Sequence, residues 1–183
     1  MENPYRAFEL LQAGDEDGLR RLLEQDPAAS DARDANGVSL LMHTLYRGRR
    51  DLAELIASKK KALDIFEATS LGRLDRLKEH LRDAAAINSH SKDGFTALHF
   101  ACFFGQPEAA RLLLERGAPS IVNARQQGGW VPIHAAAQNG DRPMVELLLK
   151  HRADPKLTND DGKTPAMIAR EKGHEKIATL LEK

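Results

Sequence analysis

The sequence predicts an all-α solenoid, in which short helix pairs follow one another along the chain and stack on their neighbours. Two observations support this fold class. A twelve-residue pattern that begins and ends with glycine occurs at 94–105, again at 129–140 and, more loosely, at 162–173. The apolar residues that follow each pattern recur at the spacing of an amphipathic helix. Units with a period in the low thirties bury their apolar faces only by stacking.

Residues 94–118 show how one unit is built. Thr96-Ala97-Leu98-His99 begins a short first helix, and Gly105 supplies the left-handed backbone conformation that ends it. Pro107 suits the first turn of a second helix, where its missing N–H leaves no bond unmade. Because each pair is too short to be stable alone, the second helix must face its neighbours, and it does so through Ala109, Leu112, Leu113 and, on the flank, Leu114.

The glycine that ends the first helix gives the register of the whole chain. Its occurrences are 34, 24, 33, 35 and 33 residues apart and define six units: Gly14, Gly48, Gly72, Gly105, Gly140 and Gly173. The first unit has Tyr5 and Phe8 in place of the regular Thr and His, and the last unit ends in polar residues. Such deviations suit units that cap a stack.

The pattern Gly-x-Thr-Pro-Leu-His-x-Ala-Ala-x-x-Gly, followed by Leu-Leu and Gly-Ala, resembles the ankyrin repeat. Two units carry most of the match. The resemblance implies about six helix-turn-helix repeats joined by hairpin loops in a single domain over 1–183. Their approximate ranges are 1–36, 37–60, 61–93, 94–128, 129–161 and 162–183.

Two spacings depart from this period. Gly48 and Gly72 are only 24 residues apart, and Lys59-Lys60-Lys61 leads almost directly into the third repeat. We therefore expect the hairpin between repeats two and three to be missing or shortened. The stretch from Gly105 to Gly140 is longer than the period, and the surplus falls in Ala118–Asn123, where we expect a longer or bulged hairpin.

Composition and charge narrow the class of partners. The chain has 27 acidic and 27 basic side chains and one cysteine. A zero formal net charge removes the broad attraction to nucleic acid or to an anionic membrane. The apolar runs are far shorter than a membrane span, and no export signal is visible at the amino terminus. We expect a cytoplasmic protein, or a nuclear one in a eukaryote, that is monomeric when alone.

Residues that could carry metal or catalytic chemistry fit structural positions instead. His99 and His134 stand where, in ankyrin repeats, the imidazole bonds within its own repeat and to the adjoining loop, and a metal site would need further ligands. Cys102 takes a small buried position. Gly162-Lys163-Thr164 lacks the earlier glycine of a phosphate-binding loop, because Leu157 stands there. We expect no catalytic, metal or cofactor site.

Aromatic residues occupy the positions that ankyrin repeats use for binding. The resemblance places three kinds of position along a concave groove: the residue after the first glycine, the two residues before the closing glycine, and the hairpin tip. Five of the nine aromatic residues (six Phe, two Tyr and one Trp) stand there. Such rings either pack on one another or await a partner, and both alternatives stay open. The predicted partner-binding residues are Tyr46, Arg47, Phe95, Phe103, Phe104, Trp130, Gln138, Asn139 and Lys163.

The sequence therefore favours a non-enzymatic protein-protein interaction module that holds a protein partner along this groove. Because the helices fix the aromatic side chains before contact, little chain entropy is lost on binding. The alternative is an inhibitory or recruiting subunit of an enzyme complex. A stand-alone enzyme has only scattered polar residues in its favour.

Overall fold

The computed structural model describes residues 5–117 and 121–183, which form two compact units. The first unit ends at Leu63 and the second begins at Asp64. The regular elements of the described residues are helices, and one isolated β-bridge joins Arg33 to Ser39. The predicted all-α fold class is therefore confirmed. Whether the two units behave as a single domain over 1–183 stays a prediction.

Two helix pairs make up the first unit. Its elements are α1 (Arg6–Ala13), α2 (Glu16–Gln25), the 3₁₀ helix η1 (Pro27–Asp31), α3 (Leu40–Tyr46) and α4 (Arg50–Lys59). Helix α1 packs on α2 and on α3, and α3 packs on α4. An ion pair between Arg49 and Glu16 joins the two repeats. Aliphatic side chains from α2, α3 and α4 are fully buried: Leu19, Leu23, Leu40, Leu41, Leu52 and Ile56.

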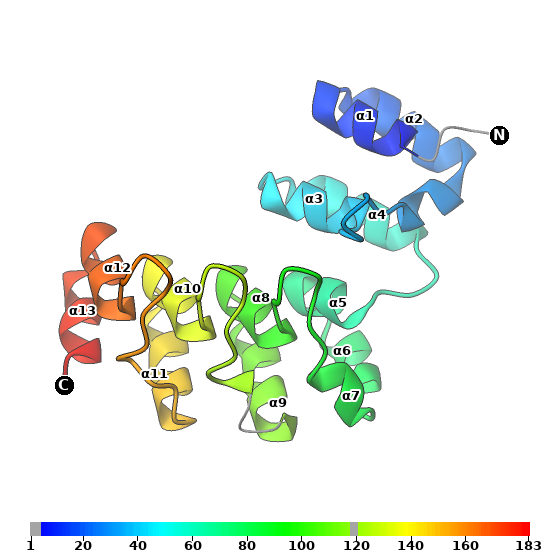
Figure 1. Ribbon diagram of the computed structural model, residues 1–183. Helices are drawn as coiled ribbons and strands as arrows, with labels where there is room; N and C mark the ends of the chain where they lie inside the picture. Colours follow the sequence, from blue (N-terminus) through cyan, green and yellow to red (C-terminus); the bar gives the residue numbers. More distant parts are fainter. Residues whose placement is uncertain (1–4, 118–120) are drawn as a thin grey trace. The chain divides into compact units, whose positions relative to one another are not determined.

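The second unit stacks four further pairs. Figure 1 shows its first helices side by side in one row, and they are α5 (Ile65–Leu71), α8 (Ala97–Phe103), α10 (Pro132–Gln138) and α12 (Pro165–Glu171). The second helices are α6 (Leu74–His80), α9 (Pro107–Arg116), α11 (Arg142–Lys150) and α13 (Glu175–Leu181), and the short α7 (Ala84–Ile87) follows α6. Each first helix contacts the first helix of the next repeat. This is the stacking that the sequence period predicts.

Caps and glycines set the helix ends. The six glycines predicted to end the first helices have φ between 61° and 80°, a left-handed conformation that the absence of a Cβ makes accessible. In the irregular third repeat, the Asp64 side chain accepts the Glu67 N–H at 2.8 Å. The Glu67 carboxylate accepts the Asp64 N–H at 3.1 Å. This reciprocal capping box starts α5 without the Thr and His of the regular repeats.

The connection between α4 and α5 contains no hairpin. Only Lys60–Asp64 lie between these helices, whereas backbone hydrogen bonds close hairpin turns at 91–94, 126–129 and 159–162. The predicted loss of the hairpin between repeats two and three is thus confirmed. The longer hairpin expected at Ala118–Asn123 begins at residues outside the described part of the chain. Its later residues Ile121 and Val122 are buried.

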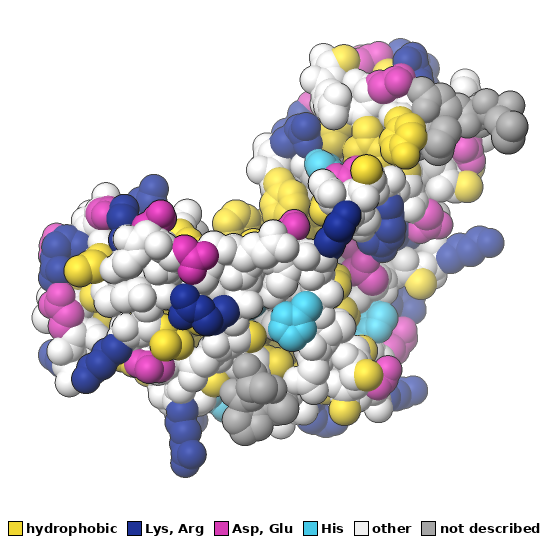
Figure 2. Space-filling model, viewed as in Figure 1, with side chains coloured by type: hydrophobic (Ala, Val, Ile, Leu, Met, Phe, Trp, Pro, Cys, Tyr) yellow, Lys and Arg dark blue, Asp and Glu magenta, His cyan; other side chains and the backbone are white. Residues whose placement is uncertain are grey.

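The surface carries charges of both signs. Figure 2 shows acidic and basic side chains interspersed over the visible face of the molecule, in keeping with the balance of 27 of each in the sequence. Among residues 5–117 and 121–183, no helix has the length and apolar character needed to span a membrane.

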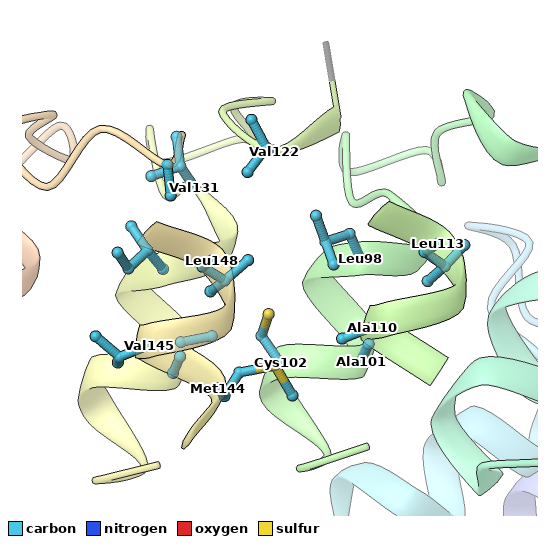
Figure 3. Close-up of a cluster of buried hydrophobic side chains, with 14 of the residues drawn as sticks. Leu98, Ala101, Cys102, Ala110, Leu113, Val122, Val131, Met144, Val145 and Leu148 are labelled. Atoms are coloured by element: carbon cyan, nitrogen blue, oxygen red, sulfur yellow. The ribbon is translucent and has the colours of Figure 1, made fainter. Parts of the chain in front are cut away.

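A continuous hydrophobic core runs through the second unit from Ile65 to Leu181. Figure 3 shows its centre, where side chains of α8 face those of α9 and α11. Removing this apolar surface from water is the main favourable contribution to the fold. The fully buried side chains drawn there include Leu98, Ala101, Cys102, Ala110, Leu113, Met144, Val145 and Leu148.

Cys102 should be chemically inert in the folded protein. Its side chain is fully buried, and burial raises the pKa of its thiol, so the reactive thiolate is nearly absent at neutral pH. We expect no reaction of the native protein with dithiobis(nitrobenzoate), and reaction of one thiol per chain in urea, measured by absorbance. Rapid labelling of the native chain would contradict the buried position.

Candidate partner-binding site

Two buried histidines hold the hairpin loops against the first helices. His99 Nδ1 accepts the backbone N–H of Thr96 at 3.1 Å, so Nε2 carries the proton and donates to the Trp130 carbonyl at 3.2 Å. His134 repeats this arrangement. Its Nδ1 accepts the backbone N–H of Val131 at 3.1 Å, and its Nε2 donates to the Lys163 carbonyl at 3.1 Å. Burial lowers the pKa of His99 to about 4 and also lowers that of His134. Both rings are therefore neutral at pH 7, in the structural role that the sequence predicts.

Five phenylalanine rings pack together around α8, and one of them is Phe66 of α5, which meets Phe100 edge to face at 5.5 Å. Phe100 is stacked on Phe95 with ring centroids 5.3 Å apart and on Phe104 at 6.4 Å. Phe103 meets Phe104 edge to face at 5.0 Å. Aromatic pairs prefer such offset and edge-on geometries. Because 43% of Phe103 is still exposed, the cluster also presents an apolar surface to water.

A hollow of about 220 Å³ lies beside these rings, between repeats four and five. We name it the aromatic pocket. It is smaller than the roughly 300–1,000 Å³ that is usual for small-molecule sites, so it has room for a side chain rather than a cofactor. None of the described side chains that line it is charged at pH 7. They are Phe95, His99, Phe103, Gln126, Trp130, Val131, Ala135 and Gln138.

The aromatic pocket is open because repeat five has a small residue where its neighbours have large ones. Counted from the N-cap, the fourth helical residue is Phe100 in α8, Ala135 in α10 and Ile168 in α12. Ala135 lines the pocket, and its single methyl group leaves the space unfilled. The aligned repeat pattern places these three residues at one position, but only the structure shows that the small one borders a hollow.

The paired positions before the closing glycine have different surroundings. Gln138 lines the aromatic pocket. The next residue, Asn139, donates through Nδ2 to the last two carbonyls of α8, at 3.1 and 2.8 Å. Gln106 likewise donates to the Ser70 carbonyl near the end of α5, at 3.3 Å. Asn139 therefore stabilises the stack, whatever it contributes to binding.

The other predicted binding residues are not among those that line the aromatic pocket. Lys163 Nζ forms an ion pair with Glu171 at 2.8 Å, and this hydrogen-bonded carboxylate raises the pKa of Lys163. In the first unit, Tyr46 is the last residue of α3 and is 46% exposed. Arg47 follows it and donates to the His43 carbonyl at 3.3 Å. The pocket thus brings together four of the nine predicted residues.

Sequence reasoning missed Gln126 and Ala135 as components of this site. Gln126 is the first residue of the 126–129 hairpin turn, and its contribution depends on how that loop folds back over α8. Within the described residues, no group of three or more His, Cys, Asp or Glu side chains could hold a metal ion. The lining of the aromatic pocket consists of apolar side chains, the neutral ring of His99 and two amide groups, which can contact a ligand by packing and by hydrogen bonds.

Comparison with known proteins identifies the repeats. A family model described as "Ankyrin repeats (3 copies)" matches residues 8–124, 65–159 and 118–183. The chain belongs to the ankyrin repeat family. The helix pairs, the hairpins and the buried histidines of this ankyrin repeat chain agree with the resemblance in its sequence.

Relatives of this ankyrin repeat chain are much longer proteins. It is 34% identical over 122 residues to putative E3 ubiquitin-protein ligase XBAT35 of Arabidopsis thaliana, covering 65% of the chain and 26% of the relative. It is 38% identical over 88 residues to BCL-6 corepressor-like protein 1 of Homo sapiens, covering 48% and 5%. It is 38% identical over 104 residues to protein fem-1 homolog A-like of Mus musculus, covering 56% and 15%. The chain spans only a minor part of each relative.

Proposed function

We propose that this ankyrin repeat chain is a non-enzymatic protein-protein interaction module whose protein partner docks on the face of the first helices. The aromatic pocket is the observation that carries this proposal, because it combines a preformed hollow with exposed apolar surface at Phe103. Aromatic side chains dominate binding at interfaces, and each contributes about 2 kcal/mol or more when fully desolvated. The other proposed contact residues follow from their repeat positions: Tyr46, Arg47, Phe104, Asn139 and Lys163.

Preorganisation is the mechanism of this binding. The rings of Phe95, Phe100 and Phe104 already pack on one another, and the Trp130 carbonyl is held by His99. A partner therefore meets side chains whose conformational entropy has already been lost on folding. Equal numbers of acidic and basic side chains give no broad attraction to nucleic acid or membrane, which supports a protein as the partner of a monomeric chain.

Quantitative affinity capture tests the proposal. The wild type and a Phe103→Ala, Trp130→Ala variant serve as baits in extracts of the source cells, with isotope-labelled mass spectrometry as the readout. Because two aromatic contacts are removed, we expect captured partners to fall at least tenfold on the variant. The matched control is Met167→Ala on α12, which removes a side chain that is 50% exposed outside the aromatic pocket.

Each partner that depends on the pocket is then purified and titrated by calorimetry. Circular dichroism must show that all baits are folded. Equal recovery on the wild type and on the double variant would place the binding surface elsewhere on the chain.

A recruiting role in an enzyme complex is the second candidate. It is favoured by the similarity to a putative E3 ubiquitin-protein ligase, of which this chain matches a part. The captured complexes would be supplied with ubiquitin, its activating and conjugating enzymes and ATP, and modification of the captured partner would be followed by immunoblotting. Ubiquitin transfer that depends on Phe103 and Trp130 supports recruitment, whereas capture without transfer supports simple binding.

A further inference from the structure

Two glutamines at the aromatic pocket differ from the other amide side chains of the second unit. Within residues 64–117 and 121–183, the side-chain amides of Gln126 and Gln138 make no hydrogen bond to another protein group, and both residues are half-buried. The remaining six Asn and Gln side chains of this unit all bond to the backbone: Asn88, Gln106, Asn123, Gln127, Asn139 and Asn159. The two side-chain amides with no bond inside the protein therefore both stand at the rim of one apolar hollow.

These two amides restrict the backbone conformation of a partner. Each carries two donor hydrogens and an acceptor oxygen, and leaving such a group buried without a bond costs about 1–3 kcal/mol. A helical segment has already paired its backbone N–H and C=O groups internally. An extended segment presents unpaired N–H and C=O groups along its length. An extended occupant can therefore pair with Gln126 and Gln138 through its backbone, whereas the middle of a helix can do so only through polar side chains.

The lining of the pocket restricts the side chain that enters it. Phe95, Phe103, Trp130 and Ala135 provide apolar surface, and both ring nitrogens of His99 are already bonded within the protein. A charged side chain entering this space would lose its hydration and find no opposite charge among the lining residues. The volume of about 220 Å³ suits one large hydrophobic side chain.

We infer that the aromatic pocket takes one uncharged hydrophobic side chain from an extended segment of the protein partner, while Gln126 and Gln138 bind the backbone on either side of it. This inference rests on the proposed function and specifies the ligand of the same site. It assigns Ala135 as the residue that determines specificity, because its small size opens the pocket.

Peptide selection on the full chain tests this inference and requires no purified partner. A phage-displayed library of random twelve-residue peptides is selected in parallel on the wild type and on Ala135→Ile, a substitution for which the next repeat supplies Ile168 as precedent. We expect wild-type binders to share one position occupied by Leu, Ile, Met or Phe. Ala135→Ile should weaken the synthetic peptides at least tenfold in fluorescence anisotropy, with an unchanged melting temperature.

Backbone recognition is tested on the selected peptides. Gln126→Leu and Gln138→Leu should each weaken binding about tenfold, and Gln127→Leu, whose amide bonds to Lys92, is the matched control that should not. Replacing the peptide amide beside the anchor with an ester removes one N–H donor. This change should weaken binding to the wild type but not to the glutamine variant that has lost the matching acceptor.

Replacing the hydrophobic anchor of the peptide with Ala should reduce affinity about tenfold or more, and Asp or Lys there should abolish binding. Enriched peptides that carry a charged anchor, that are helical when bound, or that bind Ala135→Ile equally well would overturn the inference. So would a library that yields no binder. If the inference fails in this way but affinity capture still depends on Phe103 and Trp130, the proposed protein-binding function is retained. The failure of the inference can therefore be told apart from the failure of the proposed function.

Discussion

Lowering the pH from 7 to 4 should destabilise the second unit by about 3 kcal/mol through His99 alone, with a further contribution of the same sign from His134. Burial lowers the pKa of His99 from 6.5 to about 4. Between these values the unfolded chain binds more protons than the folded chain, so the free energy of unfolding falls as the pH falls. The stabilisation is complete above pH 6.5 and is lost towards pH 4. A protonated His99 would also turn an N–H towards the N–H of Thr96.

Urea unfolding at several pH values measures this effect. Trp130 is the single tryptophan of the chain and lies in the second unit, so its emission reports the unfolding of that unit. The control is His99→Gln with His134→Gln, because a glutamine at this capping position keeps an acceptor for the helix N–H and does not titrate. The loss between pH 6.5 and pH 4 should shrink in this variant. Identical pH profiles would show that the two rings are not the cause.

Leu113→Ala should cost about 2–5 kcal/mol of stability, the range for a fully buried leucine. Leu113 is inaccessible to solvent at the centre of the core between α8 and α9 (Figure 3). Its removal loses apolar burial and leaves a cavity that the packed neighbours fill only in part. The change should appear as a lower urea midpoint in Trp130 emission at pH 7.

The adjacent Leu112→Ala is the control for this experiment. Leu112 lies in the same helix but is only partly buried at the edge of the core, so the change in helix propensity is the same and the cavity term is smaller. We expect less than half of the Leu113→Ala effect. An equal loss for both variants would mean that propensity or the unfolded state, rather than the cavity, determines the cost.

The positions of the repeats and of their helix ends were predictable because they depend on interactions between residues close together in the sequence. Glycines that need a left-handed backbone, prolines in first helical turns and apolar residues at helical spacing each act within a few residues. The buried positions of His99, His134 and Cys102 followed from the same repeat pattern. The absent hairpin before α5 followed from counting residues between Gly48 and Gly72.

The detailed geometry of the binding site was less predictable. Gln138 and Asn139 occupy adjacent groove positions in the sequence pattern, yet successive helical residues point about 100° apart. One therefore lines the aromatic pocket, and the other bonds to α8. The pocket itself depends on the absence of a large side chain at Ala135, and a regular repeat motif gives no sign of an empty space beside it.

The side-chain hydrogen bonds that Gln106 donates to α5 and that Asn139 donates to α8 give the stack a direction. The last carbonyls of a first helix have no partner within that helix, and here they receive their donor from the repeat that comes next in the sequence. His99 depends in the same way on the Trp130 carbonyl of the following loop. As the chain leaves the ribosome from its amino terminus, these bonds become possible only when the next repeat has emerged. Native order should therefore trail synthesis by one repeat.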